Sequence, residues 1–281
     1  MTRIITDSTA DFTRQEASAL GLDIVPLRTR FGAEEYIDGV DLTPRQFYEK
    51  LIESDVVPTT SQPSPAEFEA AMAGALREAD EAVVITISGE LSGTYQSASI
   101  AAEGFGGRVR VVDSRSASIG EQILVRLALR LAGAGMGAAE LERQLLCERE
   151  KICVLALLDT LEYLKRGGRI SATVAFAGGV LAIKPVITLV DGAVSMVGKA
   201  RGSKNGGNLL NQLVEKRGVD FSRPYMLGYT GLSDAPLMKY AMDSERLWRD
   251  HAEELPVSAI GSVIGTHGGP GVIAAAFFSL K

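Results

Sequence analysis

The segment AVVITISGELSGTYQSA, residues 82–98, decides the fold class of this chain. Its first part, AVVITI (82–87), is an uninterrupted apolar and β-branched run, which is typical of a strand buried on both faces of a parallel sheet. The following residues 88–95 are rich in Ser, Gly and Thr and lead into a helix-length segment. A strand, a polar loop and a helix form the repeating unit of α/β proteins, which bind ligands at the carboxyl ends of their strands.

The same alternation continues on both sides of this segment. We therefore predict an α/β protein with two domains, an N-terminal parallel-sheet domain at 1–160 and a C-terminal mixed α+β domain at 161–281. The boundary is approximate, and segments such as 58–65 are allowed to cross it. In the second domain, two β-rich runs flank Asp191-Gly192, which predicts a hairpin, and a last strand is expected near 258–265.

The stretch at 172–190, which begins with the apolar segment ATVAFAGGVLAI (172–183), resembles a membrane span, but Lys184 and Pro185 interrupt it. Its uncharged part is shorter than the roughly 18 residues that a spanning helix needs. We interpret it as a buried wall, and leave open whether it packs in the core, at a domain interface or along an apolar cavity.

Composition excludes several classes of function. The 281 residues carry a net charge of -6, and the Lys and Arg residues are scattered, which argues against binding to nucleic acid or to an anionic membrane surface. The first twelve residues, MTRIITDSTADF, contain charges where a signal peptide would be apolar, so we expect a cytoplasmic protein without stable membrane insertion. Two cysteines and two histidines, none in a ligand cluster, predict neither a disulfide framework nor a metal site.

Hydroxyl groups are concentrated in PTTSQPSP, residues 58–65. Ser64 before a proline is a good helix N-cap, and a rigid capped turn accounts for much of this segment. Capping needs only one hydroxyl, however. Thr59, Thr60 and Ser61 therefore remain, and Thr60 and Ser61 are the candidate ligand contacts.

Ser92, Gly93 and Thr94 lie where the quoted strand gives way to a helix. A helix N-terminus offers unpaired N–H groups and a partial positive charge, which suits a carboxylate or a phosphate. A simple helix cap explains the same residues equally well on local grounds.

A third polar segment, GTHGGPG at 265–271, contains His267 among glycines that allow close approach of the backbone. Its alternatives are a tight strand-to-helix turn or a polar role for the histidine. Arg169 and Arg201 lie in glycine-containing segments, and each alone is explained as a surface charge.

Taken together, these segments resemble the DegV family, whose members include the fatty acid-binding subunit of bacterial fatty acid kinase. Eight segments occur in the family's order, and together they are specific where a single one would be weak. They are DSTAD (7–11), PTTSQPSP (58–65), ISGELSGTYQSA (87–98), VVDS (111–114), LEYLKRGGRIS (161–171), LAIKP (181–185), GKAR (198–201) and IGTHGGPG (264–271).

The resemblance implies that the protein binds a long-chain fatty acid in a tunnel between two domains. It implies no cofactor and no catalysis by this chain alone, because a separate ATP-binding kinase subunit forms the acyl phosphate. Arg201 matches a family arginine associated with that partner. The residues expected around the ligand carboxylate are Thr60, Ser61, Ser92, Gly93, Thr94, Arg169 and His267.

Three alternatives stay open. A serine hydrolase would use Ser92 and His267, although the GxSxG sequence is absent. A small-ketone subunit similar to those of dihydroxyacetone kinase would hold its substrate covalently on His267. A lipid store or sensor would need no kinase partner. No GxxxxGK[ST] loop occurs, so ATP would have to bind elsewhere.

Overall fold

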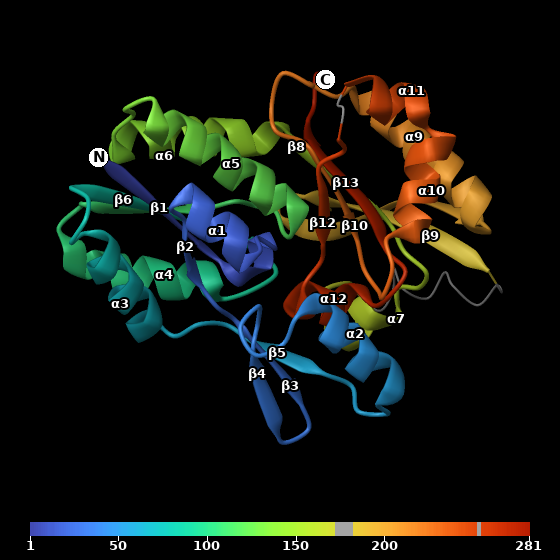
Figure 1. Cartoon of the computed structure of the whole chain (residues 1–281), viewed down its shortest axis with the longest axis horizontal. Coiled ribbons are helices and arrows are strands. Elements are labelled where there is room, and N and C mark those ends of the chain that lie inside the picture. Colours follow the sequence, from blue (N-terminus) through green and yellow to red (C-terminus); the bar gives the residue numbers. More distant parts are fainter. Residues whose placement is uncertain (172–181, 252–253) are drawn as a thin grey trace.

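The computed structural model describes residues 1–171, 182–251 and 254–281, and its strands form three sheets (Figure 1). The N-terminal sheet has the order β2-β1-β6-β7 and all of its strands are parallel. The parallel strand predicted at 82–87 is confirmed as β6. The four strands are β1 (Thr2–Asp7), β2 (Asp23–Val25), β6 (Glu81–Thr86) and β7 (Val109–Asp113).

Helices cover both faces of this sheet. In Figure 1, α3 and α4 lie on one face and α5 and α6 on the other. Thr13 and Ser64 cap α1 and α3 with complete capping boxes, which confirms the N-cap predicted at Ser64. The helical segments are η1 (Ser8–Ala10), α1 (Arg14–Leu20), α3 (Pro65–Ala75), α4 (Thr94–Ala102), η2 (Glu103–Phe105), α5 (Ile119–Gly133), α6 (Ala138–Glu148) and η3 (Arg149–Lys151).

The second sheet has six strands in the order β10-β9-β8-β13-β11-β12, antiparallel except for the pair β11 and β12. The hairpin predicted at Asp191-Gly192 is confirmed, with both residues at positive φ. The strands are β8 (Ile152–Leu157), β9 (Ile183–Val190), β10 (Ala193–Arg201), β11 (Met226–Tyr229), β12 (Val257–Ala259) and β13 (Ile273–Phe278). One face is covered by α9 (Ser203–Arg217), α10 (Ala235–Asp243), α11 (Glu245–Trp248) and η5 (Arg249–His251).

Helix α5 connects the two sheets, because it packs against β1 on one side and against β8, β11 and β13 on the other. Strand β8 belongs to the six-stranded sheet although its residues precede position 160. The division into domains at 1–160 and 161–281 stays a prediction.

A small antiparallel sheet, β4-β3-β5, lies at the lower edge of the molecule in Figure 1. The last strand expected near 258–265 is wrong in its second half, because β12 ends at Ala259 and a helix follows it. Gly261 precedes this helix, and buried carboxylates accept its first N–H groups. The elements here are β3 (Arg28–Phe31), β4 (Glu34–Ile37), α2 (Pro44–Glu53), β5 (Thr59–Ser61), α7 (Glu162–Arg166) and α12 (Ser262–Gly268).

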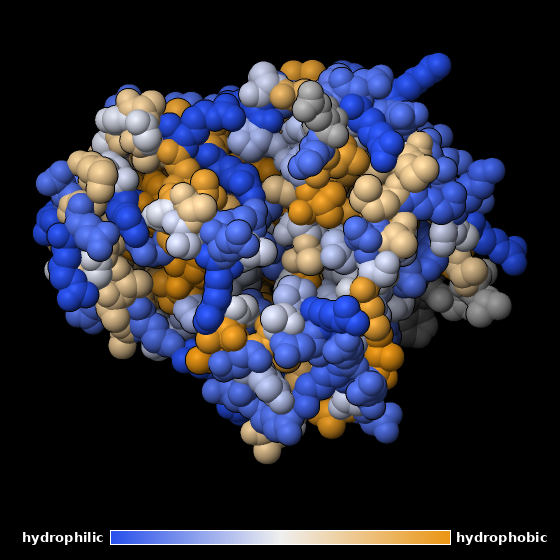
Figure 2. Space-filling model, in the orientation of Figure 1, coloured by the Kyte–Doolittle hydropathy of each residue, from blue (hydrophilic) through white to orange (hydrophobic). Residues whose placement is uncertain are grey.

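On the face shown in Figure 2, polar residues predominate and hydrophobic residues show as smaller patches between them. No helix within the described residues is long and apolar enough to cross a membrane. The described ranges also contain no cluster of His, Cys, Asp or Glu suited to a metal ion. The apolar stretch predicted as a wall at 172–183 falls almost entirely outside the described residues.

Candidate functional site

A cavity of about 340 Å³ lies between the loops of the N-terminal sheet and the six-stranded sheet. This volume is at the lower end of the roughly 300–1,000 Å³ found for small-molecule sites. The wall of the cavity is mostly aliphatic, and it includes Leu91, Ile119, Val154, Ile187, Leu189 and Val263. Both halves of the chain contribute to the cavity, and its wall suits an apolar ligand.

Polar side chains from four separate segments gather on this cavity. Five of the residues predicted from sequence line it, together with Gln62. These residues are Thr60, Ser61, Gln62, Ser92, Arg169 and His267, and the lining also includes the polar residues Ser118, Thr188 and Thr230. Gly93 and Thr94 are absent from the lining, but the Thr94 hydroxyl lies 2.9 Å from the Ser92 hydroxyl and so orients it.

Thr60 and His267 form the central polar contact, with 3.0 Å between Thr60 Oγ1 and His267 Nε2. The other ring nitrogen, Nδ1, is buried and has no hydrogen-bond partner within the described part of the chain. It lies against Gly167, where a Cβ would overlap the ring. A buried N–H without an acceptor is costly, so the proton belongs on Nε2, which donates to Thr60. The Thr60 hydroxyl is then free to donate to a ligand.

The charge state of His267 follows from its surroundings. Burial, with additional repulsion from Arg169, lowers the pKa of His267 to about 4. The imidazole is therefore neutral near pH 7 and serves as a hydrogen-bond donor. Arg169 itself donates to Leu91 O at 3.0 Å and to Gly167 O at 2.6 Å, which ties the loop after β6 to the segment after α7.

Gln62 was not singled out by the sequence, which drew attention only to hydroxyls in PTTSQPSP. Its Nε2 donates to Ser97 Oγ at 3.1 Å, and its amide lies over Gly93 so closely that a Cβ at Gly93 would overlap it. The absence of a side chain at Gly93 thus admits Gln62 to the edge of the cavity.

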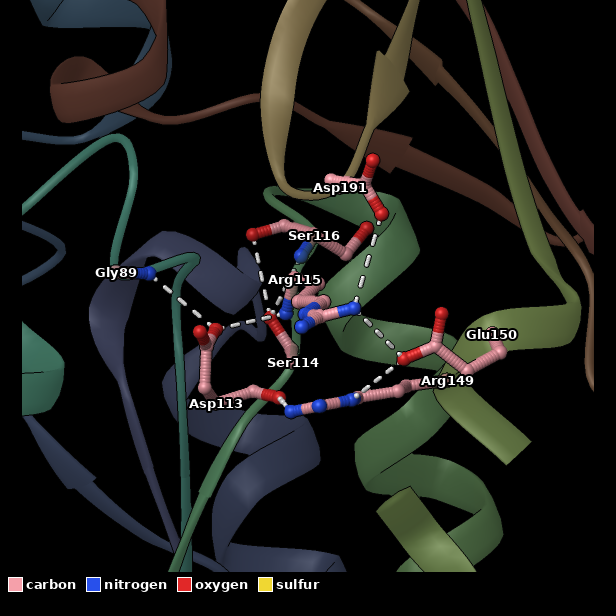
Figure 3. A network of polar contacts seen from close by, with 8 residues as sticks. All are labelled: Gly89, Asp113, Ser114, Arg115, Ser116, Arg149, Glu150 and Asp191. Atoms are coloured by element: carbon pink, nitrogen blue, oxygen red, sulfur yellow. Dashed lines mark hydrogen bonds and ion pairs between the residues drawn. The ribbon is translucent and has the colours of Figure 1, made fainter. Parts of the chain in front are cut away.

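The β9–β10 hairpin carries part of the cavity wall, and Figure 3 shows how its tip is held. Asp191 at the tip lies 3.8 Å from Arg115, which also binds Glu150 at 3.1 Å. Ser88, in the loop after β6, donates to Gly192 O at 2.8 Å. The tip is therefore fastened to the loops that follow β6 and β7.

The remaining predicted residue, Arg201, is exposed at the end of β10 and is not part of the cavity lining. The contacts of Ser92 and His267 also bear on the alternative that the protein is a serine hydrolase. Ser92 Oγ bonds Thr94 and His267 bonds Thr60, so the described contacts contain no serine–histidine pair of the kind that activates a nucleophile.

Fold and site together define a class: an α/β protein whose two main sheets enclose an apolar cavity with one polar end. The DegV family model, described as an uncharacterised protein family, matches residues 1–280. A DegV domain-containing protein of Deinococcus radiodurans is 37% identical over 99% of this chain and 98% of its own. The chain belongs to the DegV family.

Solved structures agree with this assignment. A DegV family protein from Thermus thermophilus, described by its fatty acid binding, is 35% identical with a TM-score of 0.87, covering 99% of both chains. The Streptococcus pneumoniae fatty acid kinase Fak B3 protein, loaded with linoleic acid, is 22% identical with a TM-score of 0.85 and covers 99% of both chains. The latter likeness establishes the shared fold.

Proposed function

We propose that this protein binds a long-chain fatty acid, with its acyl chain in the cavity and its carboxylate at Thr60 and Ser92, and presents it to a separate ATP-binding kinase subunit. The observation that carries this proposal is an aliphatic cavity whose lining includes the hydrogen-bonded pair Thr60 and His267 together with Ser92. The fatty acid binding of the Thermus relative supports the ligand class.

Magnitudes indicate which end of the ligand supplies the affinity. Each buried methylene contributes about 0.8 kcal/mol, so a tail of roughly fourteen methylenes contributes on the order of 11 kcal/mol before ordering costs. Each neutral hydrogen bond to the headgroup contributes about 1 kcal/mol. The cavity therefore supplies affinity, and the hydroxyl groups supply orientation.

The polar end suits phosphoryl transfer to the bound acid. Hydroxyl donors can hold a carboxylate while one of its oxygens keeps a lone pair for attack, whereas a bidentate arginine would engage both oxygens. In the proposed reaction, a carboxylate oxygen attacks the γ-phosphorus of ATP bound to the partner, and ADP leaves. Arg169, fixed by two carbonyls at the same end, supplies a positive charge near the transferred phosphoryl group.

Extraction of the purified protein followed by mass spectrometry tests the ligand class. We expect one fatty acid per chain. A covalent three-carbon adduct on His267, or an empty cavity with no binding of added fatty acid, would contradict the proposal.

Two substitutions test the division between affinity and orientation. Thr60→Val and Ser92→Ala should lower acyl phosphate formation with the ATP-binding subunit at least tenfold and leave lipid retention within about fivefold, because each removes one hydrogen bond to the headgroup of about 1 kcal/mol. Thr59→Val is the matched control, since Thr59 is an exposed neighbour in β5 outside the cavity lining. Equal losses of lipid and of phosphorylation would contradict this division.

A further inference from the structure

Helix α12 supplies cavity wall and headgroup contact, yet it lacks the usual supports of a helix. It has seven residues, and among them Val263, Ile264 and His267 line the cavity. Its N-cap is Gly261, which has no side chain to cap the helix. So short a helix is not stable alone, because nucleation costs more than a few hydrogen bonds return. Contacts from elsewhere in the chain must hold it.

Two buried carboxylates provide those contacts at the N-terminus. Asp38 Oδ1 accepts from Ser262 N at 3.1 Å and from the Ser262 hydroxyl at 2.6 Å. Asp11 Oδ1 accepts from Gly261 N at 2.8 Å. Acceptor oxygens at this end also complement the partial positive charge of the helix N-terminus. The Ser118 hydroxyl also donates to Asp11 Oδ2 at 2.5 Å. In the described part of the chain, neither carboxylate forms an ion pair with Lys or Arg, so hydrogen bonds compensate for their burial.

The same end of α12 is tied to the small sheet. The Ser262 hydroxyl lies 2.7 Å from the Thr29 hydroxyl, and because Ser262 donates to Asp38, Thr29 donates to Ser262. Thr29 on β3 pairs directly with Thr60 on β5. Thr29 and Thr60 therefore project from the same face of the sheet as cross-strand neighbours.

Helix α12 thus meets this sheet at both ends, through Ser262 and Thr29 at one end and through His267 and Thr60 at the other. Residues 262 and 267 are separated by about 7.5 Å along a helix axis. A shift of the N-terminal contact by one residue would rotate the helix by about 100° and turn His267 away from Thr60.

We propose that Asp38 is a positioning residue of the headgroup site, which holds Ser262 against Thr29 and thereby sets the register of α12 that brings His267 to Thr60. The importance of this register for ligand handling rests on the proposed function. The positional claim itself holds for any ligand of the cavity.

Nuclear magnetic resonance of the histidine rings tests the proposal in the purified full-length chain. The chain has two histidines, so exposed His251 is an internal reference for His267. We expect Asp38→Ala to raise the pH midpoint of His267 titration by at least one unit, a tenfold change in proton affinity, because the ring leaves its buried place beside Thr60. Asp38→Asn should shift it less, since the amide oxygen still accepts from Ser262. Asp55→Asn, at an exposed site, should not shift it.

A second pair of variants covers the case in which Asp38→Ala does not fold. Thr29→Val keeps the side-chain shape but removes the bond to Ser262, whereas Thr29→Ser keeps that bond. We expect the His267 midpoint to rise in Thr29→Val and to stay at the wild-type value in Thr29→Ser. An unchanged His267 midpoint in folded Asp38→Ala, or in Thr29→Val, overturns the proposal. The lipid content of the wild-type protein is measured separately. A failure of the proposed ligand is therefore distinguished from a failure of the positioning role of Asp38.

Discussion

Thr6 has one hydroxyl proton and two neighbours that compete for it. Its Oγ1 lies 2.9 Å from Ile85 O and 3.1 Å from Glu121 Oε1. Since a carbonyl can only accept, Thr6 donates to Ile85, and the contact with Glu121 requires a proton on that carboxyl group. The same conclusion follows from burial, which together with repulsion from Asp7 raises the pKa of Glu121 well above its usual value. We therefore expect Glu121 to be a neutral acid in the folded protein.

Replacing Glu121 by Gln tests this assignment. The pKa of Glu121 is higher in the folded state, so its contribution to stability is complete below the unfolded pKa and is lost as the pH rises towards the folded pKa. Gln keeps a donor for Thr6 and does not titrate. We expect Glu121→Gln to gain in unfolding free energy relative to wild type between pH 5 and pH 8, by up to about 1.4 kcal/mol per pH unit.

Urea unfolding at the two pH values measures this difference, with exposed Glu69→Gln as control. An equal loss of stability at both pH values would show that Glu121 is buried as a carboxylate.

Residue chemistry also sets the limit of what the sequence predicts about the site. Hydroxyls beside prolines and glycines indicated Thr60 and Ser92, although helix capping explained part of the same pattern. Gln62 and Gly167 gave no such signal. Their roles depend on contacts with Gly93 and His267, which are distant in sequence and meet only in the fold.

At the level of elements, the β9–β10 hairpin forms part of the cavity wall and is held in place at its tip. Its tip is fastened by the Ser88 hydroxyl, whose bond to Gly192 O is buried. Ser88→Ala removes about 1 kcal/mol of this fastening, so we expect the release of bound fatty acid to be about fivefold faster. Displacement of a fluorescent fatty acid in a stopped-flow instrument measures the rate. If Ser88→Ala releases lipid no faster than exposed Ser18→Ala, the tip does not control release.

Elements whose pattern is local were predicted well, and those held by distant contacts were not. Strand β6 has a continuous apolar run at 82–85, and the Asp191-Gly192 turn favours positive φ, so both follow from nearby residues. Helix α12, SVIGTHG, contains two glycines, Gly265 and Gly268, and its sequence favours no helix. Its helical state depends on Asp11 and Asp38, which lie more than 200 residues earlier.

At the scale of the whole molecule, the candidate site exists only after both halves of the chain have folded together. Thr60 and His267 are 207 residues apart in sequence, and the cavity wall between them comes from the loops of one sheet and the strands of another. The order of the sequence motifs resembles that of a known family, and this resemblance could indicate that these residues act together. The cavity itself could not be derived from spacing, because it is a property of how α5 joins the sheets.

Arg201, the expected partner contact, allows partner binding to be tested separately from ligand binding. It is exposed at the end of β10 and lies outside the cavity lining, so a charge reversal there should leave the bound lipid unchanged. We expect Arg201→Glu to lower acyl phosphate formation with the ATP-binding subunit at least tenfold, because an attractive charge at the contact becomes repulsive. Size-exclusion chromatography of the mixture should show reduced complex formation, whereas Lys216→Glu, at an exposed position of α9, should not reduce it. Complex formation at the wild-type level in Arg201→Glu would place the partner contact elsewhere on the surface.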